Sequence, residues 1–178
     1  MIFKSLDKAH QSELAELFTF VFTTSEGEAE GKLVGNLASV LASNIDNKDI
    51  ICFGAYENEK LLGSIFYTSL NFNDATNVYM LAPVAVHTEH QGKGVGTALI
   101  NFGLNELKKR RVNVVVTYGD PSFYSKVGFE YLPETIIQAP LTLSMPFGWL
   151  GQSLTEEPIP TLIGRPSCVE AFNDQVYW

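Results

Sequence analysis

Residues 90–100 read HQGKGVGTALI, and this stretch decides the fold. Gly92, Gly94 and Gly96 fill three of five consecutive positions, and an apolar pattern of helical period follows them at once. Glycine costs about 1 kcal/mol in a helix interior relative to alanine, so helix stability does not explain the three glycines. Glycine also adopts backbone angles that a Cβ forbids and lets a ligand approach the main chain. The stretch therefore predicts a turn that presents backbone N–H groups at the start of a helix.

The residues around this turn predict an alternation of strands and helices. Runs rich in β-branched and aromatic residues are typical of strands, and a nearly continuous apolar run is typical of a strand covered on both faces. The polar segment ENEK at 57–60 joins two of these runs and favours a hairpin. The helix that follows the glycines is expected to end near Lys109. The predicted strands are IICFGAY at 50–56, LLGSIFYTSL at 61–70, VYMLAPVAV at 78–86 and VNVVVTY at 112–118.

Two helices are predicted before the first of these strands. Asp7 is a candidate cap for the first, and a second is expected over about residues 28–42. Between them FTTSEGEAEG, residues 22–31, is polar and contains glycine, so it is predicted to be a loop.

The C-terminal part of the chain has a different composition. Asp120 and Pro121 suit the cap and first turn of a short helix over about 121–127. Beyond Tyr131 lie six of the eight prolines. This tail is expected to hold one strand, LTLSM at 141–145, and to wrap the domain, either as a lid or as protection for a sheet edge.

The composition predicts a globular protein without a metal or disulfide framework. Hydrophobic residues make up 46% of the 178 residues and charged residues 18%. Cys52 and Cys168 lie far apart and form no zinc motif, which favours reduced thiols. Twelve basic and twenty acidic residues give a net charge of −8, which argues against broad docking on nucleic acid or anionic lipid.

The chain's beginning and its apolar runs predict a cytoplasmic location. MIFKSLDKAH reaches a charge before any apolar run forms, so no signal peptide is expected. The longest apolar run, 78–86, is about half as long as a membrane span.

The glycine turn fits one phosphate-binding pattern better than two others. A strand, a glycine-rich turn and a helix together form an anion site. GxxxxGK[ST] is absent, and the spacing of the glycines breaks GxGxxG. Read from Gln91, the stretch is Q-x-x-G-x-G, which resembles the Q/R-x-x-G-x-G/A signature of the GNAT superfamily of acetyl-CoA-dependent N-acetyltransferases.

The context of the signature strengthens the resemblance. An apolar strand ending at Val86 precedes it by the family's five residues, and Phe123 and Tyr124 precede Gly128 and Phe129 as the family pattern requires. The segments LAPVAV, HQGKGVGTALI and GDPSFYSKVGF are most similar to the sequences of the YhbS-like acetyltransferases of this superfamily. The resemblance covers about residues 1–131 and is strongest over 78–131.

The resemblance implies one α/β (α+β) domain over residues 1–150, with 151–178 as a C-terminal extension packing on it. The domain would have a mixed, mostly antiparallel sheet with helices on both faces and with its fourth and fifth strands splayed. Pro83 lies where the strands would part, although a bulge without a ligand also accommodates a proline. Acetyl-CoA would be the cosubstrate, with no metal. The implied coenzyme-binding residues are Val84, Ala85, Val86, Gln91, Gly92, Lys93, Gly94, Val95, Gly96, Thr97, Ser122 and Tyr124.

Several of these residues also have ordinary structural interpretations. Lys93 adds charge near a phosphate or is a solvated surface lysine, and Thr97 donates to a phosphate or forms a local cap. The implied catalytic groups are the backbone at Val84, near the oxyanion, and the Tyr124 phenol, which faces the departing sulfur. Tyr124 can equally be a core tyrosine. Asp120 is interpreted as a helix cap, and the GDP turn that contains it replaces the asparagine with which the family commonly holds pantetheine.

The acceptor half of the site is not readable from the sequence. An amine with a pKa near 10.4 is neutral in about one molecule in 2,500 at pH 7, so the reaction needs a base or a desolvated amine. Met80 stands where histone-type relatives have an acidic base. His87, His90 and Glu89 also admit a metal interpretation, but solvated loop residues are the simpler one. The possible replacements for the base are Glu26, Glu28, Glu30, Tyr79, His87 and Glu89.

The sequence thus predicts an N-acetyltransferase that moves an acetyl group from acetyl-CoA directly to a primary amine of a small molecule or peptide. One alternative is a catalytically silent acyl-CoA-binding sensor or interaction module, which the residue Met80 favours. Another is a nucleotide-binding protein that uses the same glycine turn. The sequence leaves the acceptor and the oligomeric state open, including a possible homodimer.

Overall fold

The computed structural model describes all residues from 1 to 178 and contains one mixed seven-stranded sheet. The strand order is β1-β2-β3-β4-β5-β7-β6. The β4–β5 pair is parallel, whereas the β1–β2, β5–β7 and β6–β7 pairs are antiparallel. The elements are β1 (Ile2–Leu6), α1 (Gln11–Glu26), α2 (Glu28–Ser43), β2 (Ile50–Glu57), β3 (Lys60–Leu70), β4 (Val78–Val86), α3 (Val95–Lys109), β5 (Val114–Tyr118), α4 (Pro121–Tyr124), β6 (Glu130–Tyr131) and β7 (Trp149–Ser153). The predicted α/β class is confirmed.

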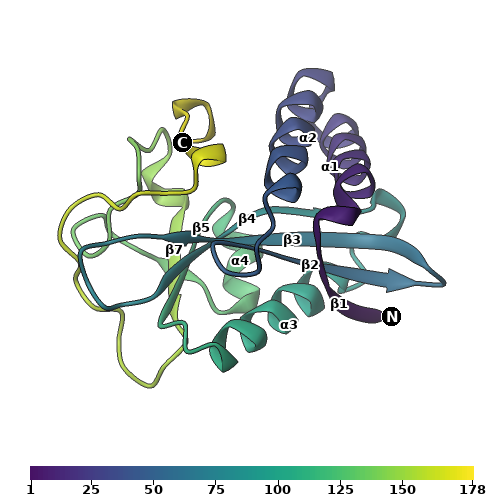
Figure 1. The fold of residues 1–178 in the computed structure, drawn as a ribbon. Helices are drawn as coiled ribbons and strands as arrows, with labels where there is room; N and C mark the ends of the chain where they lie inside the picture. The colour runs from purple at the N-terminus through teal and green to yellow at the C-terminus, as the bar shows by residue number, and fades with distance from the viewer. The chain divides into compact units, whose positions relative to one another are not determined.

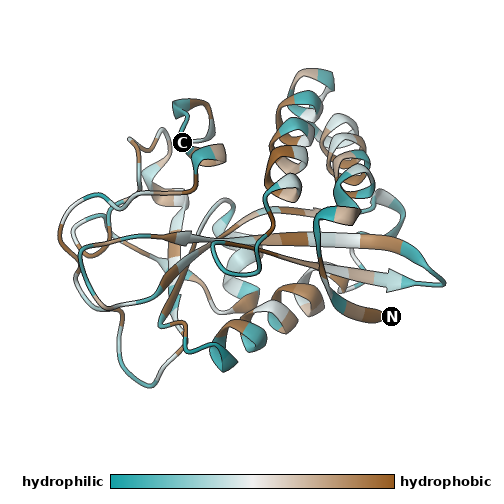
Figure 2. Cartoon of the chain, viewed as in Figure 1, coloured by the Kyte–Doolittle hydropathy of each residue, from teal (hydrophilic) through white to brown (hydrophobic).

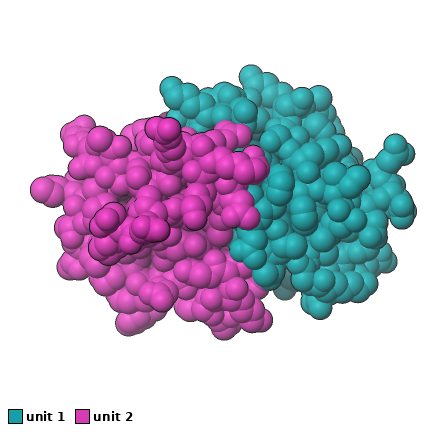
Figure 3. Space-filling view, turned by 90° about the horizontal axis from the view of Figure 1, so that it is seen from below, with its two compact units in different colours: residues 1–67, 83–103 teal, residues 68–82, 104–178 magenta.

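The chain forms two compact units, which Figure 3 shows in two colours. Unit 1 comprises residues 1–67 and 83–103, and unit 2 comprises residues 68–82 and 104–178. Both β4 and α3 therefore contribute residues to each unit. None of the helices combines the length and hydrophobicity that crossing a membrane requires.

In unit 1, helices cover both faces of the strands: α1 and α2 lie on one face and the first turns of α3 on the other (Figure 1). Phe66 of β3 packs against Phe18 of α1, with ring centroids 5.7 Å apart. The next residue, Tyr67, points to the opposite face and donates a hydrogen bond to the Ile100 carbonyl oxygen of α3 at 3.1 Å. Because both faces are covered, β2 and β3 are apolar along most of their length, as Figure 2 shows.

The junction of α1 and α2 corrects a prediction. The polar segment 22–31 is not a loop, because α1 continues to Glu26 and α2 begins at Glu28. Gly27, with φ of 99°, is the single residue between them, and its N–H donates to the Thr23 carbonyl oxygen at 3.0 Å. A Cβ on Gly31 would overlap the Thr23 side chain, so glycine in α2 permits the close approach of the two helices. The polar residues of segment 22–31 lie mostly on the exposed surface of the two helices.

In unit 2, β5 lies between a parallel and an antiparallel neighbour. Its register with β4 runs from Val78↔Val114 to Leu81↔Thr117, and it pairs with β7 along its whole length. The pairing with β4 ends there although β4 continues to Val86. Pro83, which has no N–H to donate, follows two residues later. The predicted splay of the fourth and fifth strands is confirmed.

The tail contains a strand, but not the one predicted. LTLSM at 141–145 is irregular, and the strand beside β5 is β7, which begins at Trp149. Trp149 and Leu150 of β7 are buried, whereas three of the five residues of LTLSM are exposed. The buried Trp178 ring stacks on Tyr118 at 6.2 Å, and its Nε1 donates to the Phe172 carbonyl oxygen at 2.8 Å.

Candidate functional site

The end of β4 in unit 1 is a strand edge that β5 does not cover. The register between these strands stops at Leu81, so residues 83–86 have no partner on β5. On the other edge the His87 N–H donates to the Leu62 carbonyl oxygen at 2.7 Å, which attaches the end of β4 to β3. Val84 and Val86 are half-buried, and Ala85 between them is buried. This segment can therefore offer peptide groups to a ligand.

The turn after β4 is fastened to it by Gln91. The side-chain Nε2 of Gln91 donates to the Val86 carbonyl oxygen at 2.9 Å. Gly92 and Gly94 have φ of 71° and 82°, and a Cβ at either would meet no atom within 4 Å. Backbone conformation and not crowding thus requires glycine at these two positions, because side chains are strained in the left-handed region. The space around them is open.

Helix α3 begins directly behind the turn and directs free N–H groups to it. The first intrahelical bond runs from the Ala98 N–H to the Gly94 carbonyl oxygen at 3.0 Å. The N–H groups of Val95, Gly96 and Thr97 precede it and have no acceptor in the helix. The first turn of α3 contains no acidic residue, and Lys93 in the turn is exposed. The positive helix end therefore has no carboxylate of its own helix, which suits an anionic ligand.

His87, Glu89 and His90 lie together just before this turn. Their candidate ligand atoms lie within 4.8 Å of one another. His87 Nδ1 accepts a hydrogen bond from the Glu89 N–H at 3.4 Å, and the His87 ring stacks on Phe20 with centroids 5.0 Å apart. The His90 ring meets that of His87 edge-on. These contacts account for the grouping as local capping and packing.

The ring of Tyr124 is closely packed among neighbouring residues of unit 2. It packs edge-on against Phe129 at 5.8 Å, and a Cβ on Gly119 would lie 2.7 Å from its Cε2 atom. Burial raises the pKa of Tyr124, the polar side chain of Thr117 offsets part of this rise, and the charge of Asp120 adds to it. The phenol is therefore a neutral hydrogen-bond donor at neutral pH.

Asp120 is a helix cap, as predicted. Its Oδ1 accepts from the Ser122 N–H at 2.9 Å, at the start of α4. The Ser122 hydroxyl also donates to this carboxylate, at 2.8 Å to Oδ1. The role of Ser122 in binding a coenzyme stays a prediction.

The acceptor half of the site remains without an assigned base. Met80 is buried, with 1% of its surface exposed, and its thioether cannot accept the proton of an ammonium group. Among the replacements, Glu26 and Glu89 are exposed, and the exposed Glu28 pairs with Lys32 at 3.5 Å.

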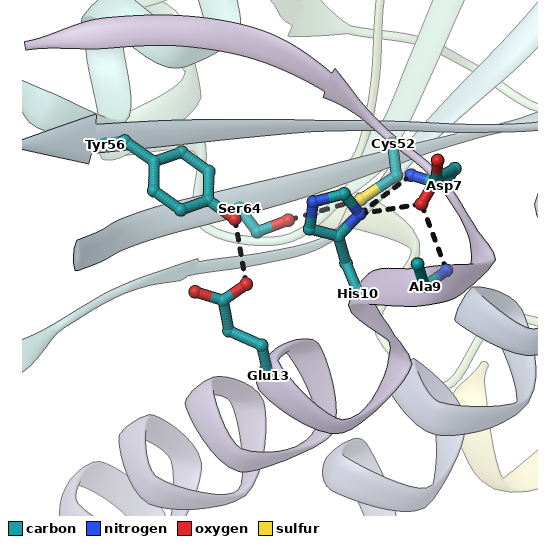
Figure 4. Close-up of polar contacts among 7 residues, drawn as sticks. All are labelled: Asp7, Ala9, His10, Glu13, Cys52, Tyr56 and Ser64. Carbon is teal, nitrogen blue, oxygen red and sulfur yellow. Dashed lines mark hydrogen bonds and ion pairs between the residues drawn. The ribbon is translucent and has the colours of Figure 1, made fainter. Parts of the chain in front are cut away.

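Figure 4 shows a second group of polar contacts in unit 1, between α1 and the strands. The Tyr56 hydroxyl donates to Glu13 Oε2 at 2.9 Å, and Cys52 Sγ lies 3.3 Å from the Ser64 hydroxyl oxygen. Burial raises the pKa of Cys52 to about 12, so this thiol stays protonated and is a poor nucleophile. The other contacts form a capping box in which Asp7 accepts from the Ala9 N–H at 3.0 Å. The group holds the fold together and offers no reactive centre.

Known proteins show which family this geometry belongs to. A family model described as "Acetyltransferase (GNAT) domain" matches residues 3–132. The chain is 32% identical over 174 residues to the uncharacterized N-acetyltransferase YjhQ of Escherichia coli K12, covering 94% of this chain and 92% of that protein. The chain belongs to the GNAT acetyltransferase family.

Solved structures of this family share the fold. The crystal structure of the GNAT family N-acetyltransferase YhbS from Escherichia coli, in complex with CoA, matches with a TM-score of 0.79 at 21% identity, over 98% of this chain and 92% of that one. A GNAT family acetyltransferase from Brucella melitensis, in complex with acetyl-CoA, matches with a TM-score of 0.68 at 20% identity and covers 97% of each chain. The predicted membership of the superfamily and the likeness to YhbS are confirmed.

One buried polar residue of β5 was not among the predicted site residues. Thr117 interrupts the apolar run VVVTY of β5, and it is fully buried. A lone polar residue in a strand covered on both faces is a usable signal, since a buried hydroxyl needs a partner.

Proposed function

We propose that this GNAT family member transfers the acetyl group of acetyl-CoA directly to a primary amine. The observation that carries the proposal is the turn at residues 91–97, where two glycines in the left-handed region precede the free N–H groups of α3. This arrangement suits the pyrophosphate of the coenzyme. Gln91 is proposed to act by fixing the turn on Val86, which differs from direct contact with the coenzyme.

The uncovered edge of β4 has a proposed role in binding the thioester. The peptide groups around Val84 and Val86 would hold the pantetheine arm, and the backbone at Val84 would support the oxyanion. The amine nitrogen attacks the thioester carbon, the C–S bond breaks, and the sulfur leaves with the bonding electron pair. The products are an amide and coenzyme A.

Tyr124 has the proposed role of hydrogen-bond donor to the departing thiolate. Its raised pKa supports a donor that is always protonated near neutral pH. A phenol with a pKa of 10 or higher is a weaker acid than a thiol near 8.5, so stabilising the thiolate by a hydrogen bond suffices. The proton that the amine loses must go to another base or to water.

The experiment for this proposal measures thiol release from acetyl-CoA with a panel of primary amines, including polyamines, aminoglycosides, amino acids and peptides. We expect saturable release with at least one class of amine. The buried Met80 favours one other function, a sensor that binds acyl-CoA without chemistry. Calorimetric binding of acetyl-CoA without thiol release from any amine would favour the sensor, and binding of ATP without coenzyme A would contradict both.

A further inference from the structure

The segment that carries Tyr124 ends in a hydrogen-bonded helix cap that includes Tyr124 itself. Helix α4 continues directly into the 3₁₀ turn Ser125–Val127, and Gly128 ends this turn in the left-handed region, with φ of 91°. The Phe129 N–H donates to the Tyr124 carbonyl oxygen, and the Gly128 N–H donates to the Ser125 carbonyl oxygen, each at 3.2 Å. Together the two bonds form a Schellman motif, which begins at Tyr124.

The motif also holds the Tyr124 ring. A Schellman motif commonly brings its first and last side chains into apolar contact. Here the Phe129 ring packs edge-on against the Tyr124 ring, with centroids 5.8 Å apart. The backbone cap and the ring are therefore coupled, so a shift of residues 124–129 would move the phenol.

One carbonyl group of the cap is bonded to a side chain of β7. Gln152 is half-buried, and its Nε2 donates to the Val127 carbonyl oxygen at 2.8 Å. Carbonyl groups in the last turn of a helix have no partner within the helix, and this bond satisfies one of them. A Cβ on Gly128 would lie 3.2 Å from Gln152 Oε1, so the same amide group also packs against the glycine of the cap.

Gln152 comes from a part of β7 that is paired with β5. It lies opposite Val115 of β5, and the preceding residue, Gly151, lies opposite both Val116 of β5 and Glu130 of β6. The connection from β5 to β6 contains Tyr124, and Gln152 attaches the middle of this connection to the sheet. Loss of the bond would leave the connection freer to shift relative to β5 and β7.

We infer that Gln152 is a positioning residue, which holds residues 124–129 on β7 and thereby keeps the Tyr124 phenol in place as a donor to the departing thiolate. The inference rests on the proposed function, because the donor role of Tyr124 comes from there. Gln152 touches neither the coenzyme nor the acceptor amine in this proposal. It acts through Val127 and Gly128.

The test separates the position of Tyr124 from its role in the reaction, and neither part needs an acceptor amine. Nuclear magnetic resonance of the protein labelled on its tyrosine rings reports the position, and the signal of Tyr124 is the one that Tyr124→Phe removes. Calorimetry of coenzyme A binding in buffers of different ionisation enthalpy reports the role. The protons released on binding measure how strongly the protein prefers the thiolate of coenzyme A over the thiol.

The variants remove one hydrogen-bond donor and keep nearly the same side-chain length. Gln152→Glu places a carboxylate at the position of the amide, and Gln152→Met removes the donor without adding charge. Gln175→Glu and Gln175→Met are the matched controls, because Gln175 Nε2 also donates to a backbone carbonyl oxygen of unit 2, that of Thr142, at 2.6 Å. Circular dichroism identifies the variants that fold.

We expect both Gln152 variants to shift or broaden the Tyr124 signal, while the signals of Tyr56 and Tyr67 in unit 1 stay in place. The preference for the thiolate should fall about twofold to tenfold, the range for one hydrogen bond between uncharged groups. In the Tyr124→Phe background, neither Gln152 variant should lower it further. The Gln175 variants should change neither quantity.

An unchanged Tyr124 signal in the folded Gln152 variants would overturn the inference, and so would equal changes in the Gln175 variants. It would also be overturned if Tyr124→Phe lowers the preference for the thiolate and the Gln152 variants do not. If Tyr124→Phe itself leaves the preference unchanged, the proposed role of Tyr124 is wrong, and the Tyr124 signal alone decides whether Gln152 positions the ring. Should Gln152→Met fail to fold, Gln152→Glu and its control decide by the same criteria.

Discussion

The chemical properties of single residues in this protein depend on how deeply each side chain is buried and on what surrounds it. Tyr124 could be found in the sequence because an aromatic pair precedes Gly128 and Phe129. Thr117 could not be assigned in that way, since its partner Leu81 lies 36 positions away in the chain. The general base for the acceptor amine could not be predicted for the same reason, because the surroundings of a side chain, and not its residue type alone, decide whether it can act as a base.

Replacing Tyr124 tests the leaving-group half of the proposed mechanism. Tyr124→Phe removes only the hydroxyl, and we expect kcat to fall about tenfold to a hundredfold, no more than the lower end of the range for general acids, while the affinity for acetyl-CoA stays the same. Kinetics with the best amine of the panel and calorimetry measure the two quantities. Unchanged kcat would exclude the phenol from the reaction.

Cys52 gives a stability prediction at alkaline pH. Burial raises its pKa from 9.0 to about 12, so its thiol favours the native state most below pH 9 and the effect is lost as the pH rises toward 12. Between pH 8 and pH 10 this loss is on the order of 1 kcal/mol. Urea unfolding of the wild type and of Cys52→Ala at both pH values measures it, and the loss should be smaller in Cys52→Ala. Equal losses would refute the assignment.

At the scale of elements, strands and helices were predicted correctly where the spacing of apolar residues in the sequence matches the buried positions of the structure. The strand, glycine turn and helix from Val78 to Lys109 were predicted, because the strand and the helix each have a long apolar pattern and the glycines mark the boundary between them. Strand β1 was missed because it is mostly exposed and so lacks an apolar pattern. Strand β7 was missed because it pairs with β5, which lies far from it in the sequence. Residues 22–31 were misjudged because an exposed helix surface and a loop have the same polar composition.

The close packing of α1 on α2 predicts an unusual effect of alanine. Gly31→Ala should gain about 1 kcal/mol in helix propensity yet lower the stability by about 1–2 kcal/mol overall. The new Cβ would lie 2.8 Å from Thr23 Cβ and 2.9 Å from its Cα, and backbone cannot move aside cheaply. Denaturant unfolding measures the change, with Asn36→Ala on the exposed face of α2 as the control. Stabilisation of Gly31→Ala would contradict the packing argument.

At the scale of the whole molecule, the C-terminal extension completes unit 2. Trp178 lies 97% buried, stacked on Tyr118 and edge-on to Trp149 and Phe172. The sequence predicted a tail that wraps the domain, but prolines alone indicate neither its route nor its anchor. Whether the tail also acts as a lid stays a prediction.

Removing the Trp178 ring should therefore destabilise the fold strongly. We expect Trp178→Ala to lower the free energy of unfolding by about 3–5 kcal/mol, the usual loss for a buried aromatic side chain. Thermal and urea unfolding measure it, with Ile163→Ala, a 95% exposed side chain of the same tail, as the control. A loss no larger than that of the control would show that the extension does not stabilise the domain.

The central claim is that acetyl-CoA binds at the glycine turn, and a matched pair of glycines tests it. Gly94 and Gly164 have φ of 82° and 84°, and a Cβ at either would meet no atom within 4 Å, so valine strains the backbone alike at both. Only Gly94 lies in the turn before α3. The decisive measurement is the calorimetric affinity of folded Gly94→Val and Gly164→Val for acetyl-CoA. We predict a Kd at least about tenfold higher for Gly94→Val and unchanged for Gly164→Val, since lost phosphate contacts exceed about 1.4 kcal/mol. Equal affinities in the two variants would contradict the account.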